Sequence, residues 1–293
     1  MKKAKVYFTK ATDREAPLRL YKTLGVSLPG KILAKVHSGE EGNQNYLHPD
    51  FWLPIIRELG ATVGECNTAY DGSRDTSKKH LVLLKKHGWI TSDFPFDLMD
   101  EEGPDDVLEL PVKGHLGGVD YVGKNLKKYD SIIVLSHFKG HPMGGYGGAL
   151  KQLSIGFASS FGKAHIHCAG GSDHSKIWTT DHDSFLESMA EAAFGVHRKF
   201  EGKAVYINAM MNMSVDCDCC AVAEDPCMKD IGILASIDPV AIDKACIDLV
   251  KASNDPGKEH FLERVNSRNG ELTYKHAASL GVGSLDYELI EVK

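Results

Sequence analysis

The segment Ser131–Ser154 has the sequence SIIVLSHFKGHPMGGYGGALKQLS. It begins with the apolar, mostly β-branched run Ile132–Leu135, which predicts a buried strand. Three side chains that are capable of acid–base chemistry or metal binding follow this strand directly, namely His137, Lys139 and His141. The order of these features indicates a strand that leads into a loop rich in reactive groups.

The same loop is dense in glycine, with Gly144, Gly145, Gly147 and Gly148. Glycine lets the backbone approach a ligand closely, and the spacing of Leu150, Leu153 and Phe157 predicts a helix after the loop. In α/β folds, ligands bind at loops beyond the carboxyl ends of strands. We therefore expect a binding site here, the alternative being a tight turn with two solvated histidines.

Composition limits the class of protein. The 293 residues are 42% hydrophobic and 25% charged, which is typical of a soluble globular chain. The net charge of −6 argues against a nucleic-acid or anionic-membrane partner. The first residues, MKKAKVYFTK, lack the apolar core of a signal peptide, and no apolar run approaches the ~20 residues of a membrane span. We expect a cytoplasmic protein.

Strands and helices are predicted to alternate along the chain. Strands are expected at Lys5–Thr9, Lys31–Val36, Ala61–Glu65, Val107–Leu110, Val119–Val122, Lys163–Cys168, Lys203–Ala209, Asp230–Ala235 and Tyr287–Val292. Helices are expected at Phe51–Leu59, Lys78–His87, Ser184–Gly195, from Asp238 onward, His260–Asn266 and Thr273–Leu280. This order predicts an α/β fold with a mixed or largely parallel sheet and helices on both faces. We expect a single domain over residues 1–293, with two lobes as the alternative.

Two histidines fall on one of the predicted strands. Alternation along Lys163–Cys168 would place His165 and His167 on the same face, where both can be metal ligands. The alternative is that they form hydrogen bonds with a neighbouring loop.

Four of the seven cysteines lie close together, as Cys217, Cys219, Cys220 and Cys227. Clustered thiolates in a reducing compartment favour zinc, copper(I) or an iron–sulfur cluster. The spacing C-x-C-C-x6-C differs from the usual ferredoxin and zinc-ribbon patterns, and adjacent cysteines in an extended segment point apart. A mixed site of two or three thiolates and a histidine is therefore easier to build. The alternative is a pair of buried thiols or a disulfide.

Two further polar loops follow predicted strands, at His37–Asn43 and Asn67–Arg74. We expect them to meet the loops at His137–Gly148 and Asn212–Cys220, with Arg74 and Lys139 binding a small anionic ligand. Asn43 and the glycines would contribute to the same site.

These segments carry a resemblance to the domain-of-unknown-function 362 family, whose members are often labelled uncharacterised iron–sulfur centre proteins. The matching segments are Val36–Asn43, Asn67–Arg74, Ser136–Leu153, Asp216–Cys219, Asp230–Asp243 and Leu280–Ile290. Many members carry an inserted ferredoxin-like module with two C-x2-C-x2-C-x3-C-P runs after the strand that matches Lys163–His167. Here Gly170–His182 contains no cysteine. The family is also distantly similar to the nickel-dependent lactate racemase group, which uses histidines and a lysine in a cleft between two α/β lobes.

Three functional hypotheses follow. The first is a protein that binds an iron–sulfur cluster or a divalent metal such as zinc or nickel. The second is a metal-dependent enzyme that acts on a small carboxylate or phosphate by racemase- or isomerase-like proton abstraction, with His137, Lys139 and His141 as the catalytic candidates. The third is an electron-transfer or metal-handling module without catalysis.

Overall fold

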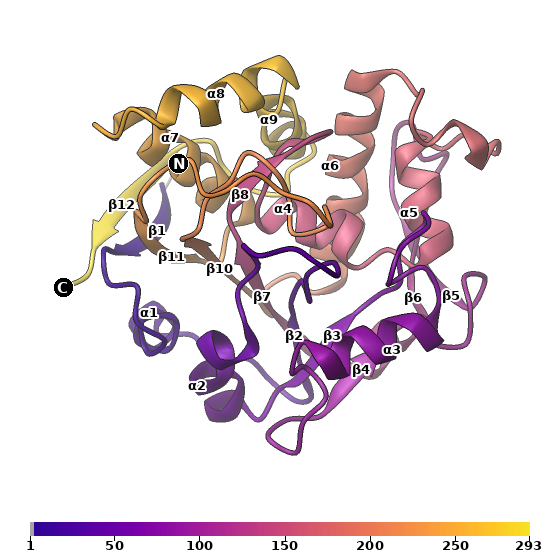
Figure 1. The fold of residues 1–293 in the computed structure, drawn as a ribbon, viewed down its shortest axis with the longest axis horizontal. Coiled ribbons are helices and arrows are strands. Elements are labelled where there is room, and N and C mark those ends of the chain that lie inside the picture. Colours follow the sequence, from indigo (N-terminus) through magenta and orange to yellow (C-terminus); the bar gives the residue numbers. More distant parts are fainter. Residues whose placement is uncertain (1–2) are drawn as a thin grey trace.

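An eight-stranded sheet forms the centre of the computed structural model, which describes residues 3–293 (Figure 1). The strand order is β12-β1-β11-β10-β7-β2-β3-β4. The strands are β1 (Ala4–Thr9), β2 (Ile32–Lys35), β3 (Thr62–Glu65), β4 (Phe96–Leu98), β7 (Ser131–His137), β10 (Ala204–Met210), β11 (Gly232–Ser236) and β12 (Tyr287–Glu291). Strand β11 runs antiparallel to both of its neighbours, and the other neighbours in the sheet are parallel. The predicted mixed, largely parallel sheet is therefore confirmed.

Helices cover both faces of this sheet, as predicted. One face carries α1 (Ala16–Leu24), α2 (Pro49–Leu59) and α3 (Ser77–Lys86), and the other carries α4 (Ala149–Lys151), α6 (His182–Lys199), α7 (Pro239–Ala252), α8 (Lys258–Ser267) and α9 (Glu271–Ser279) (Figure 1). Strand β7 lies between the two cores. Its Ile133 and Leu135 pack toward the first group of helices, and Ile132 and Val134 pack toward the second. This alternation explains why Ile132–Leu135 is continuously apolar.

Two short hairpins lie beside the main sheet. One pairs β5 (Val107–Pro111) with β6 (Val119–Gly123), and the other pairs β8 (Lys139–His141) with β9 (Gly145–Gly147). The β8–β9 hairpin follows β7 almost immediately, so the predicted loop begins as a short extended segment. A Cβ atom at Gly140 would lie 2.3 Å from the Val215 carbonyl oxygen, so glycine is required where the hairpin meets the cysteine-containing loop.

The predicted strand at Lys163–Cys168 is wrong, because this segment belongs to helix α5 (Ser160–His167). The Ser159 side chain accepts a hydrogen bond from the Gly162 backbone N–H and starts the helix. Residues two apart on a helix point in nearly opposite directions. His165 and His167 therefore do not share a face, as alternation along a strand had predicted.

The predicted start and end of α6 are also wrong. Its N-cap is Asp181, whose carboxylate accepts from the Ser184 backbone N–H at 3.0 Å, so Ser184 lies inside the helix. The helix continues through Gly195 to Lys199. Gly195 serves packing here, since a Cβ atom at this position would lie 2.8 Å from Val112 Cγ1. The start at Asp238 is confirmed, because its carboxylate caps α7.

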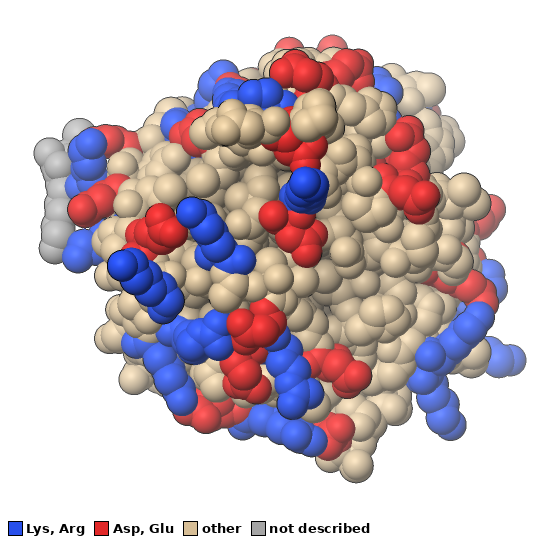
Figure 2. All heavy atoms as spheres, turned by 60° about the vertical axis from the view of Figure 1, so that its left-hand side comes forward, with Lys and Arg blue, Asp and Glu red and all other residues tan. Residues whose placement is uncertain are grey.

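Charges of both signs are interspersed over the face of the molecule that Figure 2 shows. Exposed ion pairs of the molecule include Arg19 with Asp13 and Lys22 with Glu58. Within residues 3–293, we find no helix with the length and apolar composition needed to cross a bilayer. The mixed surface contrasts with the charge distribution of the interior cavity described below.

One buried acid on β6 is not balanced by a partner. Asp120 is fully buried, and neither carboxyl oxygen has a hydrogen-bond partner among the described residues. Burial raises the pKa of Asp120 from its ordinary value of 3.8 to about 8. The folded state therefore keeps this acid protonated at a pH at which the unfolded chain has already ionised it.

We predict that Asp120→Asn changes the pH dependence of stability. The unfolded chain releases the Asp120 proton near pH 4 and the folded chain near pH 8, so the wild type loses up to ~1.4 kcal/mol of stability per pH unit between these values. Asp120→Asn cannot ionise at this position, so the variant does not show this fall in stability with rising pH. Urea unfolding at pH 5 and pH 7 should show the variant gaining at least about 1 kcal/mol on the wild type over that interval. Parallel pH profiles for the two proteins would contradict the prediction.

Candidate functional site

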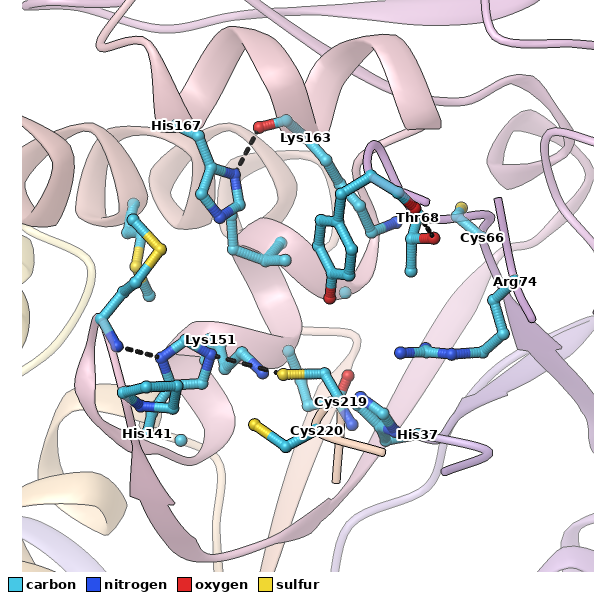
Figure 3. A pocket seen from close by; sticks show the side chains of 18 of the residues that line it. His37, Cys66, Thr68, Arg74, His141, Lys151, Lys163, His167, Cys219 and Cys220 are labelled. Carbon is cyan, nitrogen blue, oxygen red and sulfur yellow. Dashed lines mark hydrogen bonds between the residues drawn. The ribbon is translucent and has the colours of Figure 1, made fainter. Parts of the chain in front are cut away.

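A cavity of about 360 Å³ lies at the carboxyl ends of β2, β3 and β7 (Figure 3). All four predicted loops contribute to its wall, through His37, Arg74, Lys139 and Cys219 among others. Further parts of the wall come from the ends of β2 and β3, from α4, α5 and α6, and from a π-helical turn at Gln152–Gly156. π-Helical turns are rare and occur often at functional sites. The loops that follow separate strands therefore meet at one place.

A buried carboxylate, Asp218, holds two of the predicted catalytic residues. His137 Nδ1 lies 2.8 Å from Asp218 Oδ1, and Lys139 Nζ lies 2.8 Å from Asp218 Oδ2. Burial alone would raise the pKa of Asp218, but the charges of His137 and Lys139 hold it well below its usual range. The other ring nitrogen of His137 donates to the Met211 carbonyl at 2.6 Å. Both ring nitrogens of His137 thus face oxygen acceptors, which suits a positioning role better than metal ligation.

The third predicted catalytic residue belongs to a different group. Ligand atoms of His141, Cys217 and Cys219 all lie within 4.8 Å of one another, and the Lys151 ammonium lies 3.0 Å from Cys217 Sγ. Burial works to raise the pKa of Cys217, but the hydrogen bond from Cys219 and the charge of Lys151 outweigh it, so the pKa is well below the usual range. The Lys151 ammonium and the Cys219 thiol therefore favour the thiolate form of Cys217.

These three residues suit a soft metal ion in donor type and spacing. The protonation of His141 works against binding, however, because its Nδ1 accepts from the backbone N–H groups of Met143 (3.1 Å) and Gly144 (2.8 Å). The ring proton must then lie on Nε2, which faces Cys219 Sγ at 3.7 Å. A metal at Nε2 would require this proton to move to Nδ1, and both backbone donors would lose their acceptor.

Cationic side chains dominate the cavity wall as a whole, which carries five lysines or arginines and one carboxylate, Glu65. Arg74 pairs with Glu40 at 3.0 Å and with Glu65 at 3.3 Å, but its Nη2 atom is buried without a partner in the described chain. Lys35 donates to the Val36 carbonyl and to Gln152 Oε1, and Lys163 donates to the Ala158 carbonyl. The partners found for these two ammonium groups are all neutral.

Burial changes the pKa values of Lys35 and Lys163, the two lysines that have neutral partners. It lowers the pKa of Lys35 to about 8, and it also lowers the pKa of Lys163. A negative charge placed between them and Arg74 would therefore be stabilised, and it would in turn favour the charged form of both lysines.

Two histidines of the wall have opposite hydrogen-bonding roles (Figure 3). His167 Nδ1 donates to the Lys163 carbonyl at 2.7 Å, which leaves an acceptor lone pair on Nε2. His37 Nδ1 accepts from the Gly39 N–H at 3.1 Å, which leaves a proton on Nε2. Burial lowers the pKa of His167 to about 4 and lowers that of His37 as well, so both rings are neutral near pH 7. One ring can accept a proton and the other can donate one.

The structure places the other predicted site residues as follows. Asn43 donates to the carbonyl oxygens of Cys217 (3.3 Å) and Cys220 (2.8 Å), so it fixes the shape of the cysteine loop. Cys220 lines the cavity, whereas Cys227 lies outside the His141 group, with its thiol on the Met213 carbonyl. His165 hydrogen-bonds the Leu116 carbonyl and is not part of the cavity wall.

The glycines of the predicted loop have mainly internal neighbours. Gly147 and Gly148 line the cavity, but a Cβ atom at Gly148 would lie 2.4 Å from Asp243 Oδ1. That carboxylate accepts from the Ala149 and Leu150 backbone N–H groups and so occupies the start of α4. Gly145 has a φ of +74°, and Gly144 donates to His141. Asp243 therefore already accepts two backbone N–H groups next to the loop at which we expected a ligand to bind.

Sequence reasoning missed Lys35, Glu65, Lys151 and Lys163. A signal existed for the first two, because each is a charged residue at the carboxyl end of a short apolar strand. Lys151 and Lys163 stand in helical segments with no such signal, since a lysine on a helix is usually exposed.

The site and the sheet define a mixed α/β protein with a cationic cavity at its strand ends. A family model described as "Domain of unknown function (DUF362)" matches residues 32–248, and the chain therefore belongs to this family. No curated protein sequence matches the chain.

Two solved structures align with this chain at TM-scores below 0.5. One is a structural-genomics crystal structure of a Thermotoga maritima protein, with 14% identity and a TM-score of 0.48, covering 89% of this chain and 58% of that protein. The other is the lactate racemase apoprotein from Thermoanaerobacterium thermosaccharolyticum, with 12% identity and a TM-score of 0.44, covering 70% of this chain and 50% of that protein. The chain thus spans between half and three fifths of the length of these two proteins.

We predict that Asp218→Asn destabilises the protein by roughly 3–5 kcal/mol at pH 7, because His137 and Lys139 would lose their buried counter-charge. The Asp218 pKa is lowered by folding, so this contribution is present above the unfolded pKa near 4 and disappears as the pH falls toward the folded value. Urea unfolding at pH 7 measures the change. Asp225→Asn, an exposed substitution in the same loop, should stay within about 0.5 kcal/mol of wild type. Equal effects of the two variants would contradict the assignment.

Proposed function

We propose that this protein is an enzyme that binds a small carboxylate or phosphate in the cationic cavity and transfers a proton to or from it. The observation that carries this proposal is the pair of buried lysines Lys35 and Lys163, whose ammonium groups have only neutral hydrogen-bond partners among the described residues and which lie in the same cavity wall as Arg74. Burying an ammonium group without a counter-charge is unfavourable, and this arrangement persists in a chain whose net charge is −6. An anionic ligand supplies the missing counter-charge.

The groups around this charge suit recognition of an oxyanion. Arg74 Nη2 and Gln152 Nε2 are buried donors at the cavity, and neither has a hydrogen-bond partner within residues 3–293. Arginine presents its donors in a planar fork that matches carboxylate and phosphate oxygens, whereas lysine acts as a point charge. We expect the anion to bind Arg74 and Gln152 through hydrogen bonds, with Lys35 and Lys163 providing electrostatic attraction.

The neutral histidines supply the proton-transfer groups. His167 Nε2 has no hydrogen-bond partner in the described chain and is available as a base, while His37 can donate from Nε2. Nearby cations favour the negative charge that develops when a proton leaves carbon next to a carboxylate. The charge of Lys139 is compensated by Asp218, so we do not assign this lysine to the proton transfer.

We predict that Lys163→Met weakens anion binding by at least about tenfold, because it removes a buried charge without leaving a carboxylate unpaired. The probes are inorganic phosphate and malonate, measured by calorimetry and by the rise in melting temperature that a bound ligand causes. Lys85→Met, which removes an exposed charge from α3, is the matched control and should bind as wild type does. Failure of the wild type to bind either probe at about 10 mM, or equal affinity in wild type and Lys163→Met, would contradict the proposal.

The second candidate function is binding of a soft metal ion, which the grouping of His141, Cys217 and Cys219 favours. Such an ion would polarise an oxygen of the bound anion, and Lys151 would have to give up its contact with Cys217. An iron–sulfur cluster needs more thiolates than this group supplies, so it would have to recruit Cys220 or Cys227.

We predict that protein purified without oxygen contains about one equivalent of zinc or nickel and no acid-labile sulfide, if this second function applies. Cys217→Ser and Cys219→Ser should each lower the metal content, while Cys168→Ser, outside the group, should not. Iron with sulfide would instead support a cluster. Protein that stays metal-free after incubation with either ion would contradict metal binding, and the anion-binding proposal would be unaffected.

A further inference from the structure

The cavity has two chemically different halves. Arg74, Lys35 and Lys163 belong to the charged half. The other half is formed by Pro142, Met143, Ile155, Trp178, Phe185 and Met189. Figure 3 shows His167, which stacks on Phe185 with ring centroids 4.9 Å apart, on the side of the cavity opposite Arg74. A ligand that reaches from Arg74 to His167 therefore meets charge at the first residue and the aromatic surface of Phe185 and Trp178 at the second.

Trp178 stands at the rim of the apolar half. Its side chain is 60% exposed, whereas Trp52 and Trp89 are almost completely buried. Its ring lies 5.5 Å from the Tyr70 ring and 6.3 Å from the His167 ring, measured between centroids. The indole thus connects the segment between α5 and α6 with the loop after β3. A large aromatic side chain left exposed at the rim of a cavity is typical of a surface that contacts a ligand.

Size restricts what this surface can contact. Pockets for small ligands have volumes of about 300–1,000 Å³, so a cavity of about 360 Å³ is at the small end of that range. A dinucleotide or a long acyl chain is too large to be enclosed. An acidic group attached to one or two rings is of suitable size.

We propose that the anion bound by this cavity is an aromatic acid or an aryl phosphate, whose ring stacks against Trp178 while its charged group reaches Arg74 and Lys163. This inference rests on the proposed anion-binding function and adds the class of substrate. The rings of Tyr70 and His167 both lie near the Trp178 ring, so aromatic side chains surround the place where we expect the ligand ring. The apolar residues Met143 and Ile155 exclude water from the ring.

The test compares methyl phosphate with phenyl phosphate, which have similar charge and differ in the ring. We expect wild-type protein to bind phenyl phosphate at least about tenfold more tightly, because aromatic stacking and apolar burial add to the shared phosphate contacts. Phenyl phosphate, but not methyl phosphate, should also protect Trp178 fluorescence from quenching by acrylamide. Of the three tryptophans, Trp178 is the exposed one.

Variants at Trp178 separate stacking from folding. Trp178→Ala should weaken the binding of phenyl phosphate until its affinity is within about twofold of that of methyl phosphate, whose own affinity should not change. Trp178→Phe should keep most of the preference for phenyl phosphate over methyl phosphate. A melting curve for each variant checks that it is folded. Equal binding of both ligands to wild type, or an equal loss of both in Trp178→Ala, would overturn this inference and leave anion binding intact. If neither ligand binds, the proposed function fails, and the substrate class fails with it.

Discussion

The buried carboxylate of Asp218 joins the parts of the chain that build the site. Its two oxygens contact His137 at the end of β7 and Lys139 at the start of β8, and its backbone carbonyl accepts from the Glu40 N–H in the loop after β2. One residue of the cysteine loop is therefore tied to two neighbouring parallel strands. Three charged groups in a low-dielectric interior attract one another strongly and are hard to separate. The positions of Cys217 and Cys219 on either side of Asp218 follow from this anchor.

The charges of the cavity are balanced unevenly. Lys151 has a thiolate beside it, and Lys139 has a carboxylate, so these two lysines are compensated within the protein. Lys35 and Lys163 donate to neutral oxygens, and burial lowers the pKa of each. Lys139 and Lys151 thus have anionic partners, whereas the hydrogen-bond partners of Lys35 and Lys163 are neutral. An anion is expected beside Lys35 and Lys163, and the thiolate group has less need of a metal ion to balance its charge.

Backbone hydrogen bonds decide what each histidine can do. His37 and His141 accept backbone N–H groups at Nδ1, whereas His167 donates from Nδ1 to a carbonyl. A neutral imidazole has one donor and one acceptor, so the bond at Nδ1 sets the role of Nε2. Within one cavity, Nε2 is therefore a donor in His37, the neighbour of the Cys219 thiol in His141 and an acceptor in His167. A count of histidines along the chain contains none of this information.

The sequence by itself determined the alternation of strands and helices, the buried β7 strand and the meeting of four polar loops at strand ends. These features depend on local periodicity and on the rule that parallel strands present their carboxyl ends at one edge. Tertiary structure decided that Lys163–His167 is helical and that Lys151 lies beside Cys217. It also decided that the Asp243 carboxylate accepts the backbone N–H of Ala149, directly after the glycine loop. Short apolar segments have similar local energies as strand or helix, and the pairing of distant charges depends on packing between segments far apart in sequence. For that reason the composition of the cavity was visible only once the chain was folded.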